Sequence, residues 1–503
     1  MRLGFLIDNR KCIGCHACTL ACKSEHDVPL GVNRTWVKQV ETGEFPAVRR
    51  SFHVMRCNHC ADAPCVEICP VSALYIRPDG IVDFDNGRCI GCKGCLQACP
   101  YDALYIDPRN DTAAKCNFCS HRVDRGLLPA CVVACPEQAI VAGDLQDPAS
   151  FIAQLVAGQP VQVRKPEKGT NPSLYYIEGD GAALDPMAAR GGRCTTTDEP
   201  QDRRPLQALG VLGSLEGASA ARVSYDAPKS PPPWGWHVSA YLVTKALAAG
   251  LLLLPLGAAL VFGQEVPYAL LLACGLGSLL MQAATAALLV ADLQRPDRFL
   301  NVLLRGNSSS WLVRGAWILS AFGAASSLWL LATWRAWPAA GLVFGWLSLL
   351  LAPCAAIYTA FLFAQAKGRD LWQSPLQPVH MALHALLAGA AGVLLLEATV
   401  APAAGLGAAA ARILLIGLPF DVLLALAEIA LPHPTKAAAA AARHLHAGEA
   451  APRFWGVVVL GSLLAAVLVG ALDAHAAGAI LTLLVLVARN DLWVRAGQTV
   501  PLS

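Results

Sequence analysis

Sixteen of the 19 cysteines in this chain form four groups of four within the first 135 residues. In bacterial ferredoxins, a C-x2-C-x2-C-x3-C run followed by proline binds a [4Fe-4S] cluster, and its fourth cysteine binds the neighbouring cluster. Proline follows the last cysteine of the second, third and fourth groups. The spacing therefore predicts about four [4Fe-4S] clusters. The groups are Cys12, Cys15, Cys18, Cys22; Cys57, Cys60, Cys65, Cys69; Cys89, Cys92, Cys95, Cys99; and Cys116, Cys119, Cys131, Cys135.

Disulfides and zinc explain this spacing less well. Disulfides are usual in small secreted domains, and we expect no secretory signal before these cysteines. Zinc sites usually combine two C-x2-C pairs, or one pair with histidines, and give no reason for a third close cysteine in each run. Cys194, Cys274 and Cys354 belong to no group, and we assign them no role.

Composition changes sharply along the 503 residues. Residues 1–180 carry charges of both signs, residues 237–503 are largely apolar, and residues 181–236 are rich in Gly, Ala, Pro and Arg. We predict a cysteine-rich domain, a linker and a membrane part over these three ranges. The net charge of +3 is small and no basic run is interleaved with aromatic residues, so we expect no nucleic-acid partner.

Short strand patterns follow the cysteine groups. Ala73–Ile76, the turn Asp79-Gly80 and Ile81–Phe84 predict a β-hairpin. Ala103–Ile106 and Ala139–Val141 repeat the first of these strands after the next two groups, which indicates an internal repeat. We expect an α+β domain of double-ferredoxin type, followed by an all-α polytopic membrane bundle.

Eight apolar runs in the second half are long enough to cross a membrane, which takes about 20 residues of helix. A single run could be a buried core helix, but eight in series predict a multi-pass protein of the inner (cytoplasmic) membrane. The runs cover residues 238–262, 267–291, 312–334, 339–363, 379–400, 411–431, 455–472 and 474–490.

Lys and Arg are distributed unequally about these runs. Only Arg335 and Arg412 flank one side, whereas twelve basic residues flank the side that carries the N-terminal domain. Loops rich in Lys and Arg stay in the cytoplasm, so we predict a cytoplasmic iron–sulfur domain and C-terminus. We also expect no twin-arginine leader on this chain. The twelve are Lys229, Arg295, Arg298, Arg305, Arg314, Lys367, Arg369, Lys436, Arg443, Arg453, Arg489 and Arg495.

Polar residues near the predicted spans indicate the electron partner in the membrane. Haem needs axial ligands from facing helices, but His380 and His384 share one helix face, so we expect no haem. Menaquinone or ubiquinone is the better candidate, and its carbonyls need hydrogen-bond donors. The candidates are His237, Tyr241, Asp292, Arg295 and His380, although each could instead be an interfacial anchor or part of a loop ion pair.

Two acidic residues lie deeper in the predicted sixth span. Asp421 and Glu428 are seven positions apart, which places them on one helix face. Acidic side chains inside a membrane are costly and are usually functional. We predict that these two carry protons to or from the quinone.

The N-terminal domain resembles the four-cluster electron-transfer subunits of the DMSO reductase and polysulfide reductase family. The resemblance covers residues 1–180 and rests on the four groups, the Cys-Pro endings and Cys116-Asn117-Phe118-Cys119. Lys23 departs from it, since the other groups have proline at this position. The resemblance implies four ligand sets: Cys12, Cys15, Cys18 with Cys135; Cys116, Cys119, Cys131 with Cys22; Cys57, Cys60, Cys65 with Cys99; and Cys89, Cys92, Cys95 with Cys69.

The second half resembles the NrfD-type membrane anchor of the same complexes, which has eight spans and a quinol site. The similar stretches are Trp234–His237, Asp292–Arg298, Ser310-Trp311 and Trp372–Pro378. The two parts are usually separate chains, whereas here they are joined. The resemblance implies a third, molybdopterin-containing catalytic subunit as partner, which would carry out the terminal substrate chemistry.

Together these features predict an electron-transfer and membrane-anchor subunit that connects such a partner to quinone. A cytoplasmic active face resembles that of the cytoplasmic sulfite dehydrogenases, so oxidation of sulfite with reduction of quinone is one expected reaction. Two alternatives stay open. One is a DMSO- or polysulfide-type reductase that takes electrons from quinol, and the other is a membrane protein in which the clusters drive ion translocation.

Overall fold

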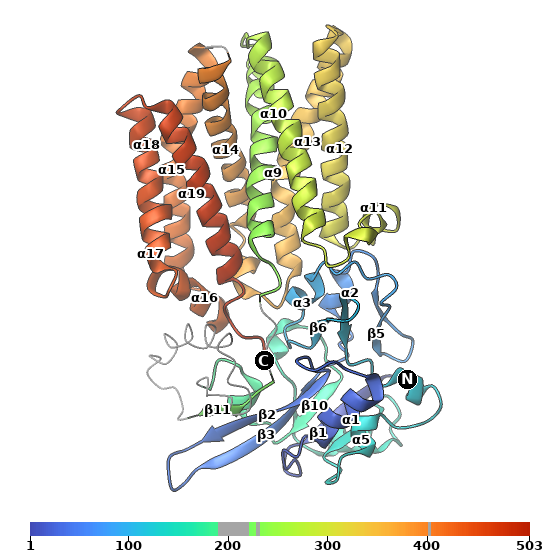
Figure 1. Cartoon of the computed structure of the whole chain (residues 1–503). Helices are drawn as coiled ribbons and strands as arrows, with labels where there is room; N and C mark the ends of the chain where they lie inside the picture. The colour runs from blue at the N-terminus through green and yellow to red at the C-terminus, as the bar shows by residue number, and fades with distance from the viewer. Residues whose placement is uncertain (190–220, 228–231, 401–403) are drawn as a thin grey trace. The chain divides into compact units, whose positions relative to one another are not determined.

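The chain forms two compact units in the computed structural model (Figure 1). The structure describes residues 1–189, 221–227, 232–400 and 404–503, so Cys194 and much of the predicted linker lie outside the described residues. The first unit, here called the cysteine-rich unit, comprises Met1–Pro233, Gln365–Arg369 and Thr499–Ser503. The second, here called the membrane unit, comprises Trp234–Ala364 and Asp370–Gln498.

A four-stranded sheet in the order β8-β1-β10-β9 forms part of the cysteine-rich unit. Its strands are β1 (Leu3–Asp8), β8 (Ile140–Asp144), β9 (Val161–Gln162) and β10 (Leu174–Ile177). β1 pairs in parallel with β10 and antiparallel with β8. All six residues of β1 are buried, and Leu6 packs with Ile152 of helix α6 (Phe151–Gly158) and with Ile177.

A second sheet has the order β11-β2-β3. β2 (Thr35–Thr42) and β3 (Arg49–Arg56) form a long hairpin, in which Thr35 lies opposite Arg56. β11 (Arg222–Tyr225) comes from the stretch predicted as linker and pairs with β2. The same stretch supplies the short helix α7 (Gly181–Leu184).

The predicted hairpin after the second cysteine group is present, and a hairpin that we did not predict follows the third group. β4 (Leu74–Ile76) pairs with β5 (Val82–Phe84), and β6 (Leu104–Asp107) pairs with β7 (Thr112–Lys115), both antiparallel. The short helices α2 (Pro64–Glu67), α3 (Gly94–Ala98), α4 (Ser120–Val123) and α5 (Ala130–Val133) contain or adjoin cysteines of the last three groups, and α1 (Ala17–His26) contains Cys18 and Cys22. The prediction of an α+β iron–sulfur domain is confirmed.

Long helices that run side by side build the membrane unit (Figure 1). Eight helical segments among the described residues are long and apolar enough to cross a membrane, which confirms the predicted number of spans. They are α9 (Trp236–Leu256) with its continuation to Val261, α10 (Tyr268–Ala291), α12 (Trp311–Trp334), α13 (Pro338–Gln365), α14 (Gln377–Thr399), α15 (Ala404–Ala430), Ala451–Gly470 with α17 (Ala451–Arg453) and α18 (Gly461–Gly470), and α19 (His475–Ala496). Two shorter helices, α11 (Asn301–Leu304) and α16 (Lys436–Ala447), lie between spans.

Small residues let α9 and α14 approach each other closely. A Cβ atom on Gly250 would lie 2.1 Å from the Ala385 carbonyl oxygen and 2.5 Å from the Cα of Gly389. Such a distance is below any ordinary contact, so only glycine fits at this crossing. Close approach of backbones at small residues is a common way for membrane helices to associate.

Candidate functional site

Three of the four cysteine groups end in the same local structure. The segments Cys69–Ala73, Cys99–Ala103 and Cys135–Ala139 all have the sequence Cys-Pro-x-x-Ala. The residue before each alanine, Ser72, Asp102 or Gln138, has a positive φ of 48°, 56° and 48°, respectively. This turn directs the following backbone N–H at the cysteine, and the N-to-Sγ distances are 3.2 Å for Ala73 and Cys69 and 3.3 Å for Ala139 and Cys135.

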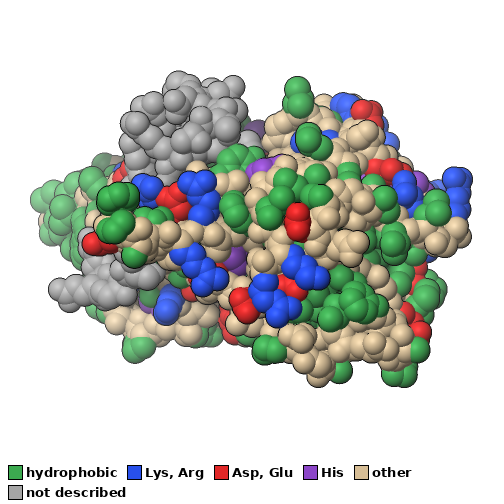
Figure 2. Space-filling model, turned by 90° about the horizontal axis from the view of Figure 1, so that it is seen from below, with side chains coloured by type: hydrophobic (Ala, Val, Ile, Leu, Met, Phe, Trp, Pro, Cys, Tyr) green, Lys and Arg blue, Asp and Glu red, His purple; other side chains and the backbone are tan. Residues whose placement is uncertain are grey.

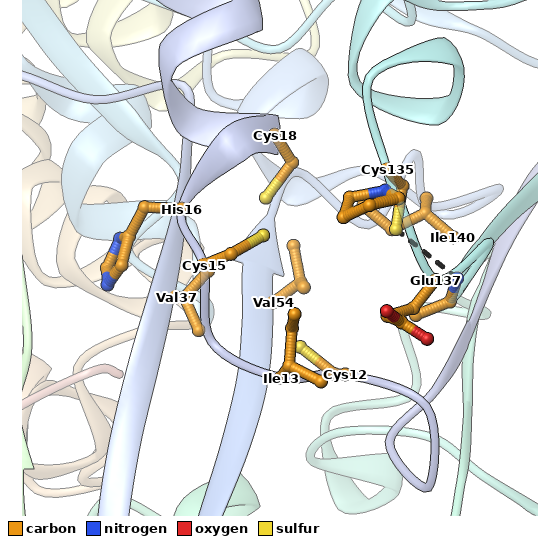
Figure 3. Close-up of a pocket in the computed structure, with 12 residues that line it drawn as sticks. Cys12, Ile13, Cys15, His16, Cys18, Val37, Val54, Cys135, Glu137 and Ile140 are labelled. Atoms are coloured by element: carbon orange, nitrogen blue, oxygen red, sulfur yellow. Dashed lines mark hydrogen bonds between the residues drawn. The ribbon is translucent and has the colours of Figure 1, made fainter.

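Cys12, Cys15, Cys18 and Cys135 line one pocket together (Figure 3). Their sulfur atoms point into the space between them, and the dashed line in Figure 3 marks the hydrogen bond that reaches Cys135. Ile13, Val37, Val54 and Ile140 form much of the remaining wall, and His16 and Glu137 also line the pocket. These four cysteines are the set that the family resemblance implies.

A second pocket contains Cys69, Cys89, Cys92 and Cys95. The Cys89 sulfur accepts hydrogen bonds from the backbone N–H groups of Gly91 and Ala113, with N-to-Sγ distances of 3.4 Å in both cases. Four thiols again surround one space of about 390 Å³, open solvent included. The set agrees with the one implied by resemblance.

The other eight cysteines of the four groups form two sets of four. In each set, one cysteine interacts electrostatically with the other three. Cys22 interacts with Cys116, Cys119 and Cys131, and Cys65 interacts with Cys57, Cys60 and Cys99. His26 lies beside the first of these sets, with its Nε2 atom 3.1 Å from the sulfur of Cys119.

The chemistry of these thiols fits iron–sulfur clusters. No described cysteine forms a disulfide. Burial raises the pKa of Cys18 to about 11 and the pKa of Cys119 to about 12, because a thiolate without a cation is poorly solvated there. Iron supplies the cation that such buried thiolates need. Sets of four thiols around a shared space, with backbone N–H donors aimed at sulfur, therefore fit a [4Fe-4S] cube.

Two residues that line the first pocket, Ile13 and Cys15, are exposed. Leu20 on α1, the helix that contains Cys18, and Val133 on α5, two residues before Cys135, are exposed as well. On the face drawn in Figure 2, hydrophobic areas lie among basic and acidic side chains, and no extended area of one charge sign covers the described residues there.

Asp421 is the centre of a buried polar group in the membrane unit. Arg489 of α19 donates a hydrogen bond from Nη1 to the Asp421 carboxylate, and its Nη2 atom lies 2.8 Å from His380 Nδ1. His384 approaches the same carboxylate at 3.3 Å. We counted Arg489 among the flanking charges in the sequence, but α19 extends past the predicted end of its span and Arg489 is buried within it.

Glu428 extends this group along α15. Its carboxylate lies 3.0 Å from His380 Nε2 and accepts a 2.8 Å hydrogen bond from the Ser374 hydroxyl. His380 thus lies between the two acidic residues that the sequence places on one helix face. His380, His384 and Asp421 could also ligate a metal by distance, but the Arg489 guanidinium already supplies the positive charge there.

Lys245 of α9 forms a second buried group with residues of α13. Its Nζ atom donates to the Thr359 hydroxyl at 2.5 Å and lies 4.6 Å from the ring centre of Tyr358. Tyr241, one turn earlier on α9, is also buried. Lys245 forms no ion pair with an acidic side chain within the described residues.

The remaining quinone candidates lie at the start of α9 and at or just after the end of α10. His237 stacks on Trp236, with ring centres 4.0 Å apart. Asp292 is the residue at which α10 ends, and it interacts electrostatically with Tyr241. Arg295 pairs with Asp297 in the following turn at 2.9 Å.

We did not predict Lys245, His384 and Arg489 as members of buried polar groups. Lys245 could have been recognised from the sequence, because a lysine within the apolar run 238–262 is unusual. Arg489 gave no such signal, because it stands at the end of the apolar stretch.

Family comparisons match both units. A 4Fe-4S dicluster domain matches residues 11–74 and another matches residues 48–145. The family described as polysulphide reductase, NrfD, matches residues 226–498, more than half of the chain.

Individual relatives resemble the cysteine-rich part. A tetrathionate reductase subunit of Salmonella typhimurium is 46% identical over 193 residues, which are 38% of this chain and 77% of that protein. A polysulfide reductase chain of Wolinella succinogenes is 40% identical over 179 residues, 35% of the present sequence and 94% of that protein. The arsenate respiratory reductase iron–sulfur subunit ArrB of Shewanella sp. is 38% identical over 232 residues, 36% of the present sequence and 98% of that protein.

Proposed function

This protein belongs to the NrfD family and joins its membrane anchor to an iron–sulfur electron-transfer unit of the 4Fe-4S dicluster type, and we propose that it serves a molybdopterin oxidoreductase complex. Electrons pass between a catalytic subunit and a membrane quinone, menaquinone or ubiquinone. The observation that carries this proposal is the gathering of sixteen cysteines into four-thiol sets on the same chain as eight candidate spans.

Four [4Fe-4S] clusters are held by the four ligand sets given above. Each cluster, when bound, takes up and releases one electron at a time. The protein contributes thiolate ligands, backbone N–H groups that donate to sulfur, and apolar side chains beside the thiols. Ala73 and Ala139 supply two of these N–H groups.

The catalytic subunit docks at the exposed rim around Cys15. Ile13 lines the same pocket as Cys15 and is exposed, and Leu20 and Val133 are exposed on the helices that lie next to its cysteines in sequence. Exposed apolar side chains of this kind can exclude water from the junction between two redox centres. Replacing Leu20 with Lys should weaken co-purification of the catalytic subunit, whereas replacing Phe45, which is also exposed, with Lys should not.

The quinone headgroup binds near Tyr241, with Lys245 and Thr359 as further donors. His237, Asp292 and Arg295 are the members of the predicted set at the ends of α9 and α10, and Asp292 is supported by its electrostatic interaction with Tyr241. His380 belongs instead to the Asp421 group, where it serves proton movement.

His380, Asp421 and Glu428 form the proton route. His380 contacts both acidic residues, so a proton can pass from Glu428 to His380 without leaving the protein. Arg489 donates to the Asp421 carboxylate and holds it beside His380. Glu428→Gln should lower quinone-linked turnover and flatten its pH profile, while Arg412→Gln, at an exposed position of α15, should change neither.

The iron–sulfur unit and the C-terminus face the cytoplasm, a proposal supported by the excess of Lys and Arg on that side. Protease treatment of spheroplasts should then leave the cysteine-rich unit intact. Its digestion would favour the rival hypothesis, a DMSO- or polysulfide-type reductase subunit that faces the periplasm.

The central test uses the full-length protein in liposomes, loaded with iron and reduced anaerobically with limiting dithionite. Addition of a menaquinone or ubiquinone analogue should restore the visible absorbance of the oxidised clusters. Tyr241→Phe should slow this step about tenfold, the effect of losing about 1.4 kcal/mol, and Cys354→Ser should not. A loaded protein that stays reduced in the presence of quinone would contradict the proposal.

The substrate and the direction of flow are tested with the catalytic subunit added. Sulfite should reduce the clusters if the complex oxidises sulfite, whereas quinol should reduce them and DMSO or polysulfide reoxidise them if it is a reductase. The buried Asp421 group also favours a second candidate, ion translocation. A pH-sensitive dye inside the liposomes would report proton movement beyond that of the quinone chemistry.

A further inference from the structure

Two buried basic residues precede the first cysteine of the second and fourth groups. The matching sequences are Arg56-Cys57-Asn58-His59-Cys60 and Lys115-Cys116-Asn117-Phe118-Cys119. Both basic side chains are 0% exposed. Among the described residues, neither forms an ion pair with Asp or Glu. Burying an unpaired charge is very costly, so each needs another source of negative charge.

Arg56 reaches from β3 into the set of Cys22, Cys116, Cys119 and Cys131. Its Nη1 atom donates to the Cys131 sulfur at 3.2 Å, and its guanidinium stacks over the Phe5 ring at 4.3 Å. Its Nε and Nη2 atoms are buried and have no hydrogen-bond partner in the described part of the chain. Arg56 also interacts electrostatically with Cys116 and Cys18. The two unsatisfied donors indicate an acceptor that the thiols alone do not provide.

Lys115 occupies the equivalent position at the end of β7. Its ammonium group donates to the carbonyl oxygens of Val82 and, at 2.9 Å, Cys116. These neutral acceptors fix its position but do not neutralise its charge. Lys115 interacts electrostatically with Cys60 and Cys65. Both cysteines belong to the set that also contains Cys57 and Cys99.

Each basic residue therefore adjoins one of these two sets in sequence and interacts with the other set. Arg56 adjoins Cys57 in sequence, but its side chain donates to Cys131 of the other set. Lys115 adjoins Cys116 and donates to its carbonyl oxygen, and it interacts electrostatically with Cys60 and Cys65. We propose that Arg56 and Lys115 are fixed counter-charges of the clusters held by these two sets, and that they raise the reduction potentials of those clusters. This inference rests on the cluster ligation given in the proposed function.

The physical reason is electrostatic. Each transfer moves one electron between neighbouring clusters, so one is oxidised and the other reduced, and no bond forms or breaks. A buried positive charge stabilises the state that carries the extra electron, and the low dielectric strengthens this effect. Arginine stays protonated at any working pH, so its contribution does not depend on pH.

The test is a redox titration of the full-length protein, followed by electron paramagnetic resonance, with iron content measured first. Arg56→Met keeps much of the apolar packing and removes the charge, whereas Arg56→Lys keeps the charge. We expect Arg56→Met to lower one midpoint potential by about 59 mV or more, which is a tenfold change for a one-electron couple. Arg56→Lys should lower it by less. Lys115→Met should lower the midpoint of a different cluster, and Arg50→Met, at an exposed position of the same strand, should change none.

Each outcome decides the question. Unchanged midpoints in variants with full iron content would overturn the proposal and leave the proposed function standing, since Arg56 would then be only structural. A wild-type protein that does not load clusters would instead contradict the proposed function. If Arg56→Met fails to load iron, Arg56→Gln replaces it, and an unshifted midpoint there overturns the assignment of Arg56.

Discussion

The two units bury charge in different ways. In the cysteine-rich unit, Arg56 and Lys115 are completely buried. Arg56 donates to a thiol and Lys115 to two backbone carbonyl oxygens, and among the described residues neither pairs with a carboxylate. In the membrane unit, Arg489 bonds directly to Asp421, and two histidines surround the same carboxylate. Charge balance in the first unit thus requires a bound inorganic cofactor, whereas in the Asp421 group side chains provide it. Folding of the first unit should depend on iron far more than folding of the second.

Lys245 refines this comparison. It lies in the membrane unit, yet its partners are a hydroxyl and an aromatic ring. It resembles Arg56 and Lys115 more than Arg489, because no described acidic side chain pairs with it. A ligand that gains negative charge would complete its environment, as we propose for the quinone.

The largest expected effect comes from removing one cluster ligand. Cys131→Ser takes away a thiolate and the hydrogen-bond acceptor of Arg56, so we expect loss of one cluster and of electron transfer to quinone. Iron content per chain should fall by about a quarter. Cys354→Ser, in α13, is the control. Full iron content in Cys131→Ser would show that Cys131 is not a ligand.

Breaking the ion pair of the membrane unit should also cost much stability. Asp421→Asn leaves the Arg489 charge buried without its partner, and we expect a loss of about 3–5 kcal/mol. The double variant Asp421→Asn with Arg489→Met should recover most of it. Unfolding in detergent, followed by helix content, measures both. Equal losses in the single and double variants would show that the pair is not coupled.

Packing at the α9–α14 crossing should respond less strongly. Gly250→Ala brings a methyl group against backbone atoms of Ala385 and Gly389, and backbone cannot move aside easily. We expect a loss of about 3 kcal/mol, at the upper end for an overpacked core, and no change in iron content. Gly341→Ala has open space around its added Cβ and should be neutral. A neutral Gly250→Ala would mean that the helices can separate without cost.

The smallest effect concerns a buried base that stays neutral. His53 is buried, accepts a 2.9 Å hydrogen bond from the backbone N–H of Asp180, and burial lowers its pKa to about 4. In the unfolded state this histidine takes up a proton near pH 6.5, so the stabilisation is complete above that pH and is lost as pH falls toward 4. Between pH 7.5 and 5 we expect a loss of about 2 kcal/mol.

His53→Gln removes this titration and keeps a hydrogen-bond acceptor. Denaturant unfolding of the full-length protein, followed by cluster absorbance at several pH values, compares it with wild type. The variant should lose less stability than wild type on acidification. Parallel pH curves would assign the pH dependence to other groups.

Local patterns in the sequence predicted much of this molecule. Cysteine spacing predicted the thiol sets with the help of the family resemblance, and apolar runs predicted eight spans. Pairings between distant residues were not predictable, because they depend on tertiary packing. Arg489 lies 68 positions from Asp421, and β11 pairs with β2 from within the predicted linker.

The Cys-Pro-x-x-Ala turns have a consequence for how a chain of iron–sulfur clusters can evolve. The hydrogen bond to sulfur comes from a main-chain N–H, which no substitution except proline removes. The two residues between Pro and Ala are therefore free to diverge, and the three copies contain Val71-Ser72, Tyr101-Asp102 and Glu137-Gln138. Surfaces around the clusters can change to suit new partners while the contacts to sulfur stay the same.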